Sequence, residues 1–188
     1  LVYGADANVR LPGAIDLSAF VLGTETPGLS GGEYAYRATL TRRGNFFHIK
    51  TGVLELGENY HSDLSFYRRT GARKWILDTG LRPRFPSLRE YGIREIHPHV
   101  VWNYYEDLEG RMVAKRLHSG ITLFLSDGGH SQLAANPTFQ RIDGPLTLHR
   151  DVDPIPAGRY SWNEWKLDFT SDPSRPLSVL AAYTWGGL

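Results

Sequence analysis

The chain has 188 residues, no cysteine, and 21 basic against 20 acidic side chains, for a formal net charge of +1. The balanced charge gives no electrostatic footprint for nucleic acid, and the lack of cysteine excludes a disulfide framework or a thiolate metal site. The sequence has no run of about 18 apolar residues, the minimum for a transmembrane helix. Residues 1–188 fit one domain or a fragment of one. Because the chain lacks an initiator Met and a signal peptide, we expect a segment of a longer protein.

The first segment alternates apolar and polar residues with the period of a β-strand. From Tyr3 to Leu11 the odd positions are apolar, and the even positions are glycine, charged or amide residues. Successive side chains of a strand point to opposite faces, so the pattern predicts one apolar and one polar face. Pro12-Gly13 then predicts a turn, and 15–21 repeats the alternation. The two segments together predict a hairpin.

The same alternation recurs down the chain, separated by turn residues and prolines. Further strand candidates are 33–42, 47–57, 75–82, 96–104, 113–125, 159–169 and 177–185, with short, ambiguous candidates at 133–140 and 145–149. Residues 58–73 break the pattern and predict a long loop. The sequence therefore predicts an all-β, antiparallel up-and-down meander of roughly ten strands joined by hairpin turns.

Two architectures fit such a meander. Apolar side chains face the core of a soluble sandwich or small barrel, whereas they face lipid in an outer-membrane barrel. Strand candidates near the membrane-spanning length and charges of both signs at mid-strand favour the outer-membrane type. Aromatic residues near strand ends, where an interfacial girdle would lie, also favour it: Tyr3, Tyr34, Phe46, Trp75, Trp102, Tyr104, Tyr160 and Trp185. We expect a barrel-like fold, with a soluble sheet as the alternative.

Two histidines offer the pattern nearest to a metal site. His97-Pro98-His99 places two imidazoles on one strand face, where they could chelate a divalent ion if a neighbouring strand supplied a third ligand. Paired histidines on a polar strand face are more often unliganded. We therefore expect no metal and no cofactor.

A polar group in the expected loop could serve acid–base chemistry. His61 and Asp63 lie there, with Glu55 and Glu58 nearby. Such loop clusters usually supply turn and capping groups, and no nucleophile or phosphate-loop motif accompanies them. We assign no catalytic residue, and an enzyme is the less favoured reading.

Exposed aromatic rings could instead stack on sugars. A carbohydrate-binding domain needs several such rings coplanar on one exposed face, whereas a barrel needs them in two rings. The candidate ligand contacts, with the two histidines, are His97, His99, Trp102, Tyr104, Trp162 and Trp165.

Several stretches resemble a large family of bacterial envelope proteins. They are 59–70 (NYHSDLSFYRRT), 136–141 (NPTFQR), 155–160 (IPAGRY) and 171–178 (SDPSRPLS), followed by YTWG at 183–186. Proteins of that family carry an N-terminal carbohydrate-binding-like sandwich and an uncharacterised C-terminal domain that is expected to be an outer-membrane β-barrel. The chain is similar to the middle and later part of that C-terminal domain. The resemblance implies an envelope location and a barrel, and no catalytic motif.

The sequence and the resemblance together predict an outer-membrane β-barrel with a structural, channel or scaffold role in the bacterial envelope. The expected partners are membrane lipid, other envelope chains and carbohydrate, and not nucleic acid. Two alternatives stay open. One is a soluble all-β carbohydrate-binding or carbohydrate-active domain. The other is a β subunit of a larger envelope assembly, which follows if the sheet has open edges that a partner must cover.

Overall fold

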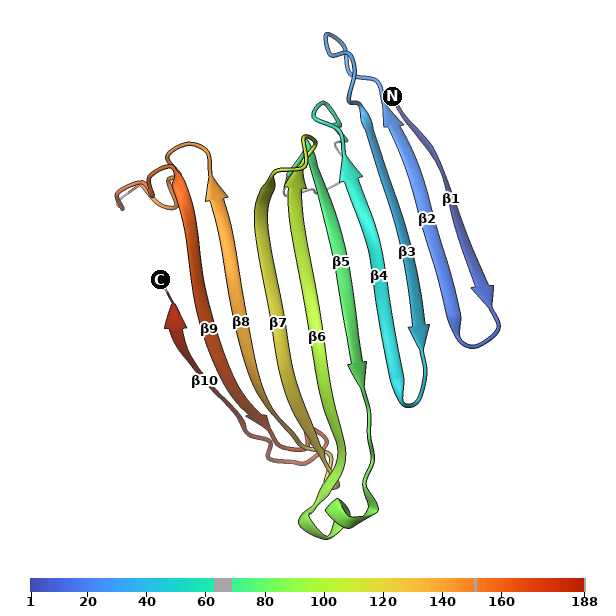
Figure 1. Ribbon diagram of the computed structural model, residues 1–188, viewed down its shortest axis with the longest axis vertical. Helices are drawn as coiled ribbons and strands as arrows, with labels where there is room; N and C mark the ends of the chain where they lie inside the picture. The colour runs from blue at the N-terminus through green and yellow to red at the C-terminus, as the bar shows by residue number, and fades with distance from the viewer. Residues whose placement is uncertain (63–68, 151, 188) are drawn as a thin grey trace. The chain divides into compact units, whose positions relative to one another are not determined.

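A computed structural model describes residues 1–62, 69–150 and 152–187. They form ten strands and one short 3-10 helix, in the order shown in Figure 1. The elements are β1 (Val2–Leu11), β2 (Ile15–Thr24), β3 (Tyr34–Arg43), β4 (Phe47–Leu56), β5 (Ala72–Leu81), η1 (Pro86–Tyr91), β6 (Ile93–Asp107), β7 (Met112–Leu125), β8 (His130–Ile142), β9 (Gly158–Thr170) and β10 (Leu180–Gly187).

The strands pair in chain order from β1 to β10 in a single antiparallel sheet. This confirms the predicted all-β, up-and-down fold class. Within the described residues, β1 neighbours only β2 and β10 neighbours only β9, so the sheet is not closed into a barrel. Period-two alternation is enough to locate the strands, because each strand has two chemically different faces.

The strand bounds differ in several places from those that the alternation predicts. β5 begins at 72 rather than 75, β6 extends over 93–107 rather than 96–104, and β10 begins at 180 rather than 177. The candidate at 145–149 is not a strand, since its only ladder contact is the isolated bridge between Leu146 and Ile155. Five residues of alternation there are too few to hold a register.

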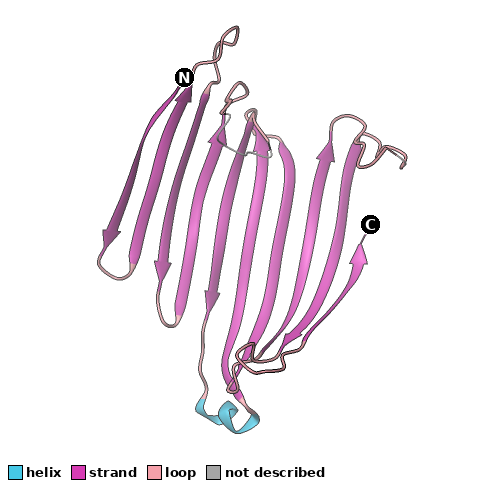
Figure 2. Cartoon of the chain, turned by 180° about the vertical axis from the view of Figure 1, so that it is seen from behind, coloured by secondary structure: helices cyan, strands magenta, loops and turns pink. Residues whose placement is uncertain are grey.

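Two prolines account for the other differences. β8 is one continuous strand of 13 residues although Pro137 lies inside it. Proline cannot donate to the ladder, and the β7–β8 register is interrupted beside Pro137, yet residues on both sides pair. Pro86 begins the η1 helix, drawn in cyan in Figure 2, and Gly92 ends it in the left-handed region at φ 74°. Six residues are too few for a helical period to be visible in the sequence.

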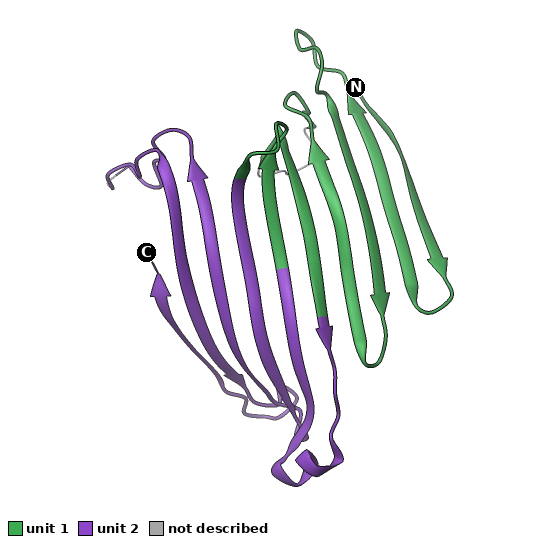
Figure 3. Cartoon of the chain, viewed as in Figure 1, with its two compact units in different colours: residues 1–79, 102–112 green, residues 80–101, 113–188 purple. Residues whose placement is uncertain are grey.

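The chain divides into two compact units, coloured separately in Figure 3. Unit 1 comprises 1–79 and 102–112, and unit 2 comprises 80–101 and 113–188. Strands β5, β6 and β7 contribute residues to both units, β7 through Met112 alone.

In unit 2 the exposure of the two faces is inverted: large apolar residues of the strands are exposed, whereas their neighbours on the opposite face are shielded. On β7, Ile121 is 53% exposed and its neighbour Thr122 is 5% exposed; on β8, Leu133 is 48% exposed and Ala134 is 1% exposed. The register aligns Ile121 with Leu133 and Leu133 with Leu167 of β9. We call the side of this row the apolar face of unit 2, and the opposite side its shielded face.

Unit 1 has the same inversion. On β3, Leu40 is 37% exposed whereas Thr39 is 8% exposed. Leu40 pairs with Leu17, and Leu17 pairs with Val9. The side that carries these residues is the apolar face of unit 1, and the side of Thr39 is its shielded face. In both units the apolar residues face outward, which is the reverse of a sheet packed on a water-excluding core.

The shielded face of unit 1 nevertheless contains a small hydrophobic cluster, which the alternation did not predict. Its buried residues are Ala35, Leu56 and Tyr60, with Phe20, Leu22 and Leu54 packed against them. Tyr60 comes from the segment after β4, so a loop residue covers the ends of the strands.

Gly57 lies where this segment begins and is in close contact with the preceding loop. A Cβ at position 57 would collide with the carbonyl oxygen of Gly32. The Gly57 amide donates to the Tyr34 carbonyl at 2.8 Å, and the Gly57 carbonyl accepts from the Gly71 amide at 3.3 Å. The backbone is therefore held on both sides, and a side chain has no room.

Gly57→Ala should lower the free energy of unfolding by about 2 kcal/mol, as overpacking against fixed backbone does. The matched control is Gly144→Ala, because a Cβ at 144 meets no atom within 4 Å. Urea-induced unfolding followed by tryptophan fluorescence measures both. Equal midpoints for the two variants would contradict the tight contact at Gly57.

Candidate functional site

A row of hydrogen-bonded polar side chains crosses the middle of four strands on the shielded face of unit 2. We call it the histidine row: His99 of β6, His118 of β7, Asn136 of β8 and Glu164 of β9. The distance between the two Nε2 atoms of His99 and His118 is 3.0 Å. His118 Nδ1 lies 2.7 Å from Asn136 Oδ1, and Asn136 Nδ2 donates to Glu164 Oε1 at 3.4 Å. Antiparallel pairing places Asn136 directly opposite Glu164.

Neighbouring residues hold the His99 ring in place. His99 Nδ1 lies 3.0 Å from the His97 carbonyl oxygen, and the two imidazoles stack with centroids 4.8 Å apart. A Cβ at Gly120 would lie 3.1 Å from His99 Cε1, so this glycine leaves room for the ring over β7. Gln132 Nε2 is 3.4 Å from His99 Nε2 and donates to Thr122 Oγ1 at 3.0 Å.

The centre of the histidine row is shielded from water. Asn136 is 2% exposed, so its amide depends on protein partners rather than on water. Glu164 is the carboxylate at one end, with an Arg116 nitrogen 3.8 Å from Glu164 Oε1. Farther along β9, Lys166 Nζ pairs with Asp168 Oδ2 at 3.0 Å.

Unit 1 carries a second polar group, at the strand ends on its apolar face. We call it the Glu55 cluster, and it consists of Tyr34, Tyr36, Glu55, Arg73, Trp75 and Glu106. The Tyr34 hydroxyl donates to Glu55 Oε1 at 2.7 Å, and the Tyr36 hydroxyl donates to Oε2 at 2.9 Å. The Glu55 carboxylate is therefore buried with both oxygens satisfied.

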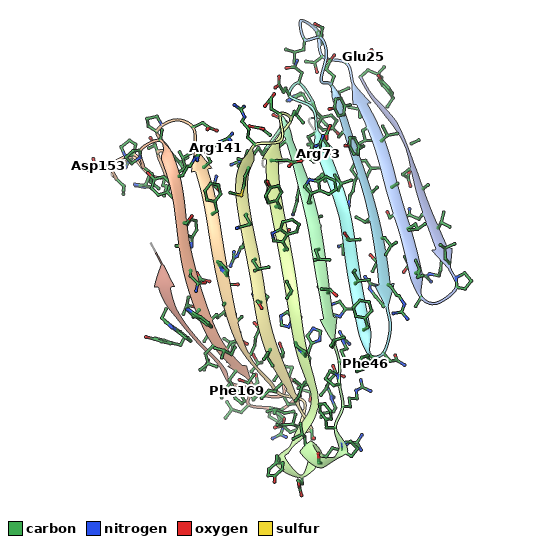
Figure 4. All side chains as sticks on the ribbon, viewed as in Figure 1. Glu25, Phe46, Arg73, Arg141, Asp153 and Phe169 are labelled. Carbon is green, nitrogen blue, oxygen red and sulfur yellow. The ribbon has the colours of Figure 1, made fainter. Side chains whose placement is uncertain are left out.

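Arg73 joins the two acidic groups of the Glu55 cluster. Its Nε donates to Glu55, and its Nη1 donates to Glu106 Oε1 at 3.0 Å. Trp75 Nε1 donates to the same Glu106 oxygen at 3.0 Å. Arg73 is labelled in Figure 4 near the start of β5. The Arg73 guanidinium is shared between the carboxylates of Glu55 and Glu106. This fixes the position of the guanidinium and leaves it little capacity to bind an anionic ligand.

The six candidate ligand contacts do not form one site. His97, His99 and Trp162 lie on the shielded face of unit 2, since Trp162 shares its parity with Glu164. Trp165 is three residues farther and faces the other side, where it stacks on Trp185 with centroids 6.4 Å apart. Trp102 and Tyr104 belong to unit 1 and contact each other, with centroids 5.3 Å apart.

Sequence reasoning missed His118 and Asn136, which complete the histidine row, because register across strands is not visible along one strand. It also placed Glu55 in an acid–base group, whereas the carboxylate is held by the Glu55 cluster. Asp63, the other acid of that group, lies outside the described residues.

No protein family, no curated protein and no solved structure matches the chain. Within 1–62, 69–150 and 152–187, no set of three or more His, Cys, Asp or Glu side chains is arranged to hold a metal ion. No helix in the described part of the chain is long and apolar enough to span a membrane.

Glu55→Gln should lower the free energy of unfolding by about 2 kcal/mol, because it weakens charge-assisted hydrogen bonds around a buried group and leaves Arg73 partly uncompensated. The control is Glu109→Gln, whose side chain is 59% exposed and pairs with Arg111 at 3.1 Å. Such a surface pair is worth at most about 1 kcal/mol. Denaturant titration compares the two variants, and a larger loss at Glu109 would show that the Glu55 cluster is not a buried ionic group.

Proposed function

We propose that this chain forms an outer-membrane β-barrel, or part of one, with a structural, channel or scaffold role in the bacterial envelope. The observation that carries the proposal is the inverted exposure of both units. Leu40, Ile121 and Leu133 are exposed, whereas the residues beside them, Thr39, Thr122 and Ala134, are shielded. An apolar outer face and a polar inner face are what a lipid-embedded barrel requires.

The distribution of charge on the apolar faces supports the same proposal. Charged side chains of that parity occur only within the first or last four residues of a described strand. They are Arg42, Glu55, Arg73, Arg94, Glu106, Lys115, Arg141 and Arg159. The shielded faces have charges at mid-strand, including Glu164 and Lys166. A central band free of charge, bounded by polar ends, fits a hydrocarbon layer between two interfaces.

The length and the pairing of the strands also support the membrane proposal. Nine of the ten strands have 10 to 15 residues, at or above the roughly 9–11 that cross a bilayer in a barrel. Strand pairing satisfies the backbone without water, as lipid demands. The polar shielded face would then line the interior and determine which solutes pass or bind.

A carbohydrate-binding domain is the second candidate, and one aromatic group favours it. Tyr183 and Trp185 stack at 5.6 Å with planes 23° apart, and Trp185 stacks on Trp165 with planes 12° apart. All three rings are exposed on one face. Exposed rings with nearly parallel planes could stack on a sugar chain.

A subunit of a larger envelope assembly is the third candidate. β1 and β10 each have a strand neighbour on one side only within the described residues. Unpaired strand edges invite another strand, whether from more of the same polypeptide or from another chain. Such an assembly is compatible with the membrane proposal and supplies the pairing that closure needs.

The deciding experiment compares the folded protein with and without a mild detergent, by size-exclusion chromatography and by gel mobility before and after boiling. We expect a monodisperse species only with detergent, with a mobility that changes on boiling. A soluble monomer without detergent overturns the membrane proposal. Binding of soluble β-glucan or chitin oligosaccharides, lost in Trp185→Ala, would then support the second candidate.

Leu167→Lys places a charge on the apolar face of β9, where that face is uncharged from Ser161 to Phe169, and should reduce folding into phosphatidylcholine vesicles at least tenfold. Basic residues near the bilayer midplane cost about 2–4 kcal/mol. The matched control, Lys166→Gln, changes the adjacent residue on the shielded face and should fold as the parent does. Unimpaired insertion of Leu167→Lys would show that this face does not contact lipid.

A further inference from the structure

We propose that His99 and His118 share one proton between their Nε2 atoms, so that the histidine row carries a single bound positive charge in the middle of the shielded face. The inference rests on which atoms of the row can donate and which can only accept. It does not depend on whether the protein lies in a membrane.

The His97 end of the row fixes the tautomer of His99. His99 Nδ1 lies 3.0 Å from the His97 carbonyl oxygen. A carbonyl oxygen only accepts hydrogen bonds, so Nδ1 must carry a hydrogen and donate it. In the neutral imidazole the other ring nitrogen is then bare. His99 therefore presents a lone pair at Nε2.

The Glu164 end fixes the tautomer of His118 through Asn136. A carboxylate only accepts, so the Asn136 amide must direct Nδ2 toward Glu164 Oε1, at 3.4 Å. This orientation points Asn136 Oδ1 at His118 Nδ1, 2.7 Å away. His118 must donate from Nδ1 and, in its neutral form, also presents a lone pair at Nε2.

In their neutral forms, therefore, neither ring carries a hydrogen on Nε2, the atom at which the two rings meet. The two Nε2 atoms are 3.0 Å apart, the distance of a hydrogen bond, and two bare nitrogens at that distance repel each other. One added proton converts the repulsion into a charge-assisted hydrogen bond. Gln132 Nε2, 3.4 Å from His99 Nε2, is a donor on the His99 side. The proton therefore belongs mainly to His118, on the side of the Glu164 carboxylate.

A metal ion is a poorer occupant of the same gap. Two nitrogens bound to tetrahedral zinc at about 2.0–2.1 Å are separated by roughly 3.3 Å, and zinc needs further ligands. The described residues provide no group of three suitable side chains. The observed 3.0 Å fits a shared hydrogen better.

Charged and titratable groups on every neighbouring strand contribute to the field at the pair. They include Glu95 and His97 on β6, Arg116 on β7, His130 on β8, and Glu164, Lys166 and Asp168 on β9. Lys166 and Asp168 pair with each other, and Glu164 is the anion linked to the pair through Asn136.

The test is NMR of the full folded chain with ¹⁵N-labelled histidine, recorded from pH 5 to 9 in the presence of a metal chelator. We expect Nδ1 of both rings to stay protonated throughout. His99 and His118 should change together in one common step as the pair gains its first proton, because coupled groups titrate as a pair. His130→Gln, on the same face but outside the row, should leave His99 and His118 changing together, because His130 is not hydrogen-bonded to either ring in the row.

Glu164→Gln is the decisive variant, with Asp168→Asn as its control on the same strand and face. A glutamine at 164 can donate to Asn136 Oδ1, which lets Asn136 reverse and donate to His118 Nδ1. The row is then satisfied without an extra proton, so above pH 7 His118 should switch to the Nε2–H tautomer. Asp168→Asn should keep the parental tautomers.

Three results would overturn the proposal. The first is a parent protein in which His118 Nδ1 is bare at neutral pH. The second is independent titration of His99 and His118. The third is a spectrum that changes when zinc replaces the chelator and returns when the chelator is restored, which would identify the pair as metal ligands.

Discussion

The structure depends on the period of two that strand pairing imposes on side chains. Every residue added to a paired strand must face one side of the sheet or the other. In a single sheet with no second layer, a strand that shields one face therefore exposes the other. Here the displayed face is the apolar one. Leaving Leu133 and Ile121 exposed in water forgoes burial worth about 25 cal/mol per Å² for each side chain. A sequence that keeps this pattern over many strands requires a surrounding that removes the apolar face from water, namely lipid or another protein surface.

The opposite constraint applies to the shielded faces, where polar groups lose access to water. A buried amide or hydroxyl without a partner costs roughly 1–3 kcal/mol, so Asn136, 2% exposed, must be bonded at both ends of its amide. Neighbouring strands lie about 4.8 Å apart, close enough for side chains directly across the sheet to join. Polar residues on this face therefore organise into transverse rows, and the histidine row crosses four strands of unit 2.

This geometry explains what the sequence could and could not predict. Alternation located the strands because it is a property of each segment alone. It did not reveal that Phe20, Leu22 and Leu54 gather on the shielded face of unit 1, where Tyr60 covers them, since that contact joins a loop to three strands. Likewise His97-Pro98-His99 stood out in the sequence, but its partner His118 is identified only by the register between β6 and β7. Pairing across strands, unlike alternation along them, depends on turn lengths and cannot be taken from single residues.

The histidine row and the Glu55 cluster lie at different positions along their strands, and the difference follows from what surrounds each face. The histidine row lies at mid-strand on the shielded face, where polar neighbours can satisfy it. The Glu55 cluster lies on the apolar face, and there it uses the second residue of β5 and the next-to-last residues of β4 and β6. Tyrosine and tryptophan present polar tips and apolar rings, so Tyr34, Tyr36 and Trp75 can bond the carboxylates while their rings continue the apolar surface. On an apolar face in lipid, charge is tolerable only where the surface meets water, and in the proposed membrane arrangement the Glu55 cluster would lie at that boundary.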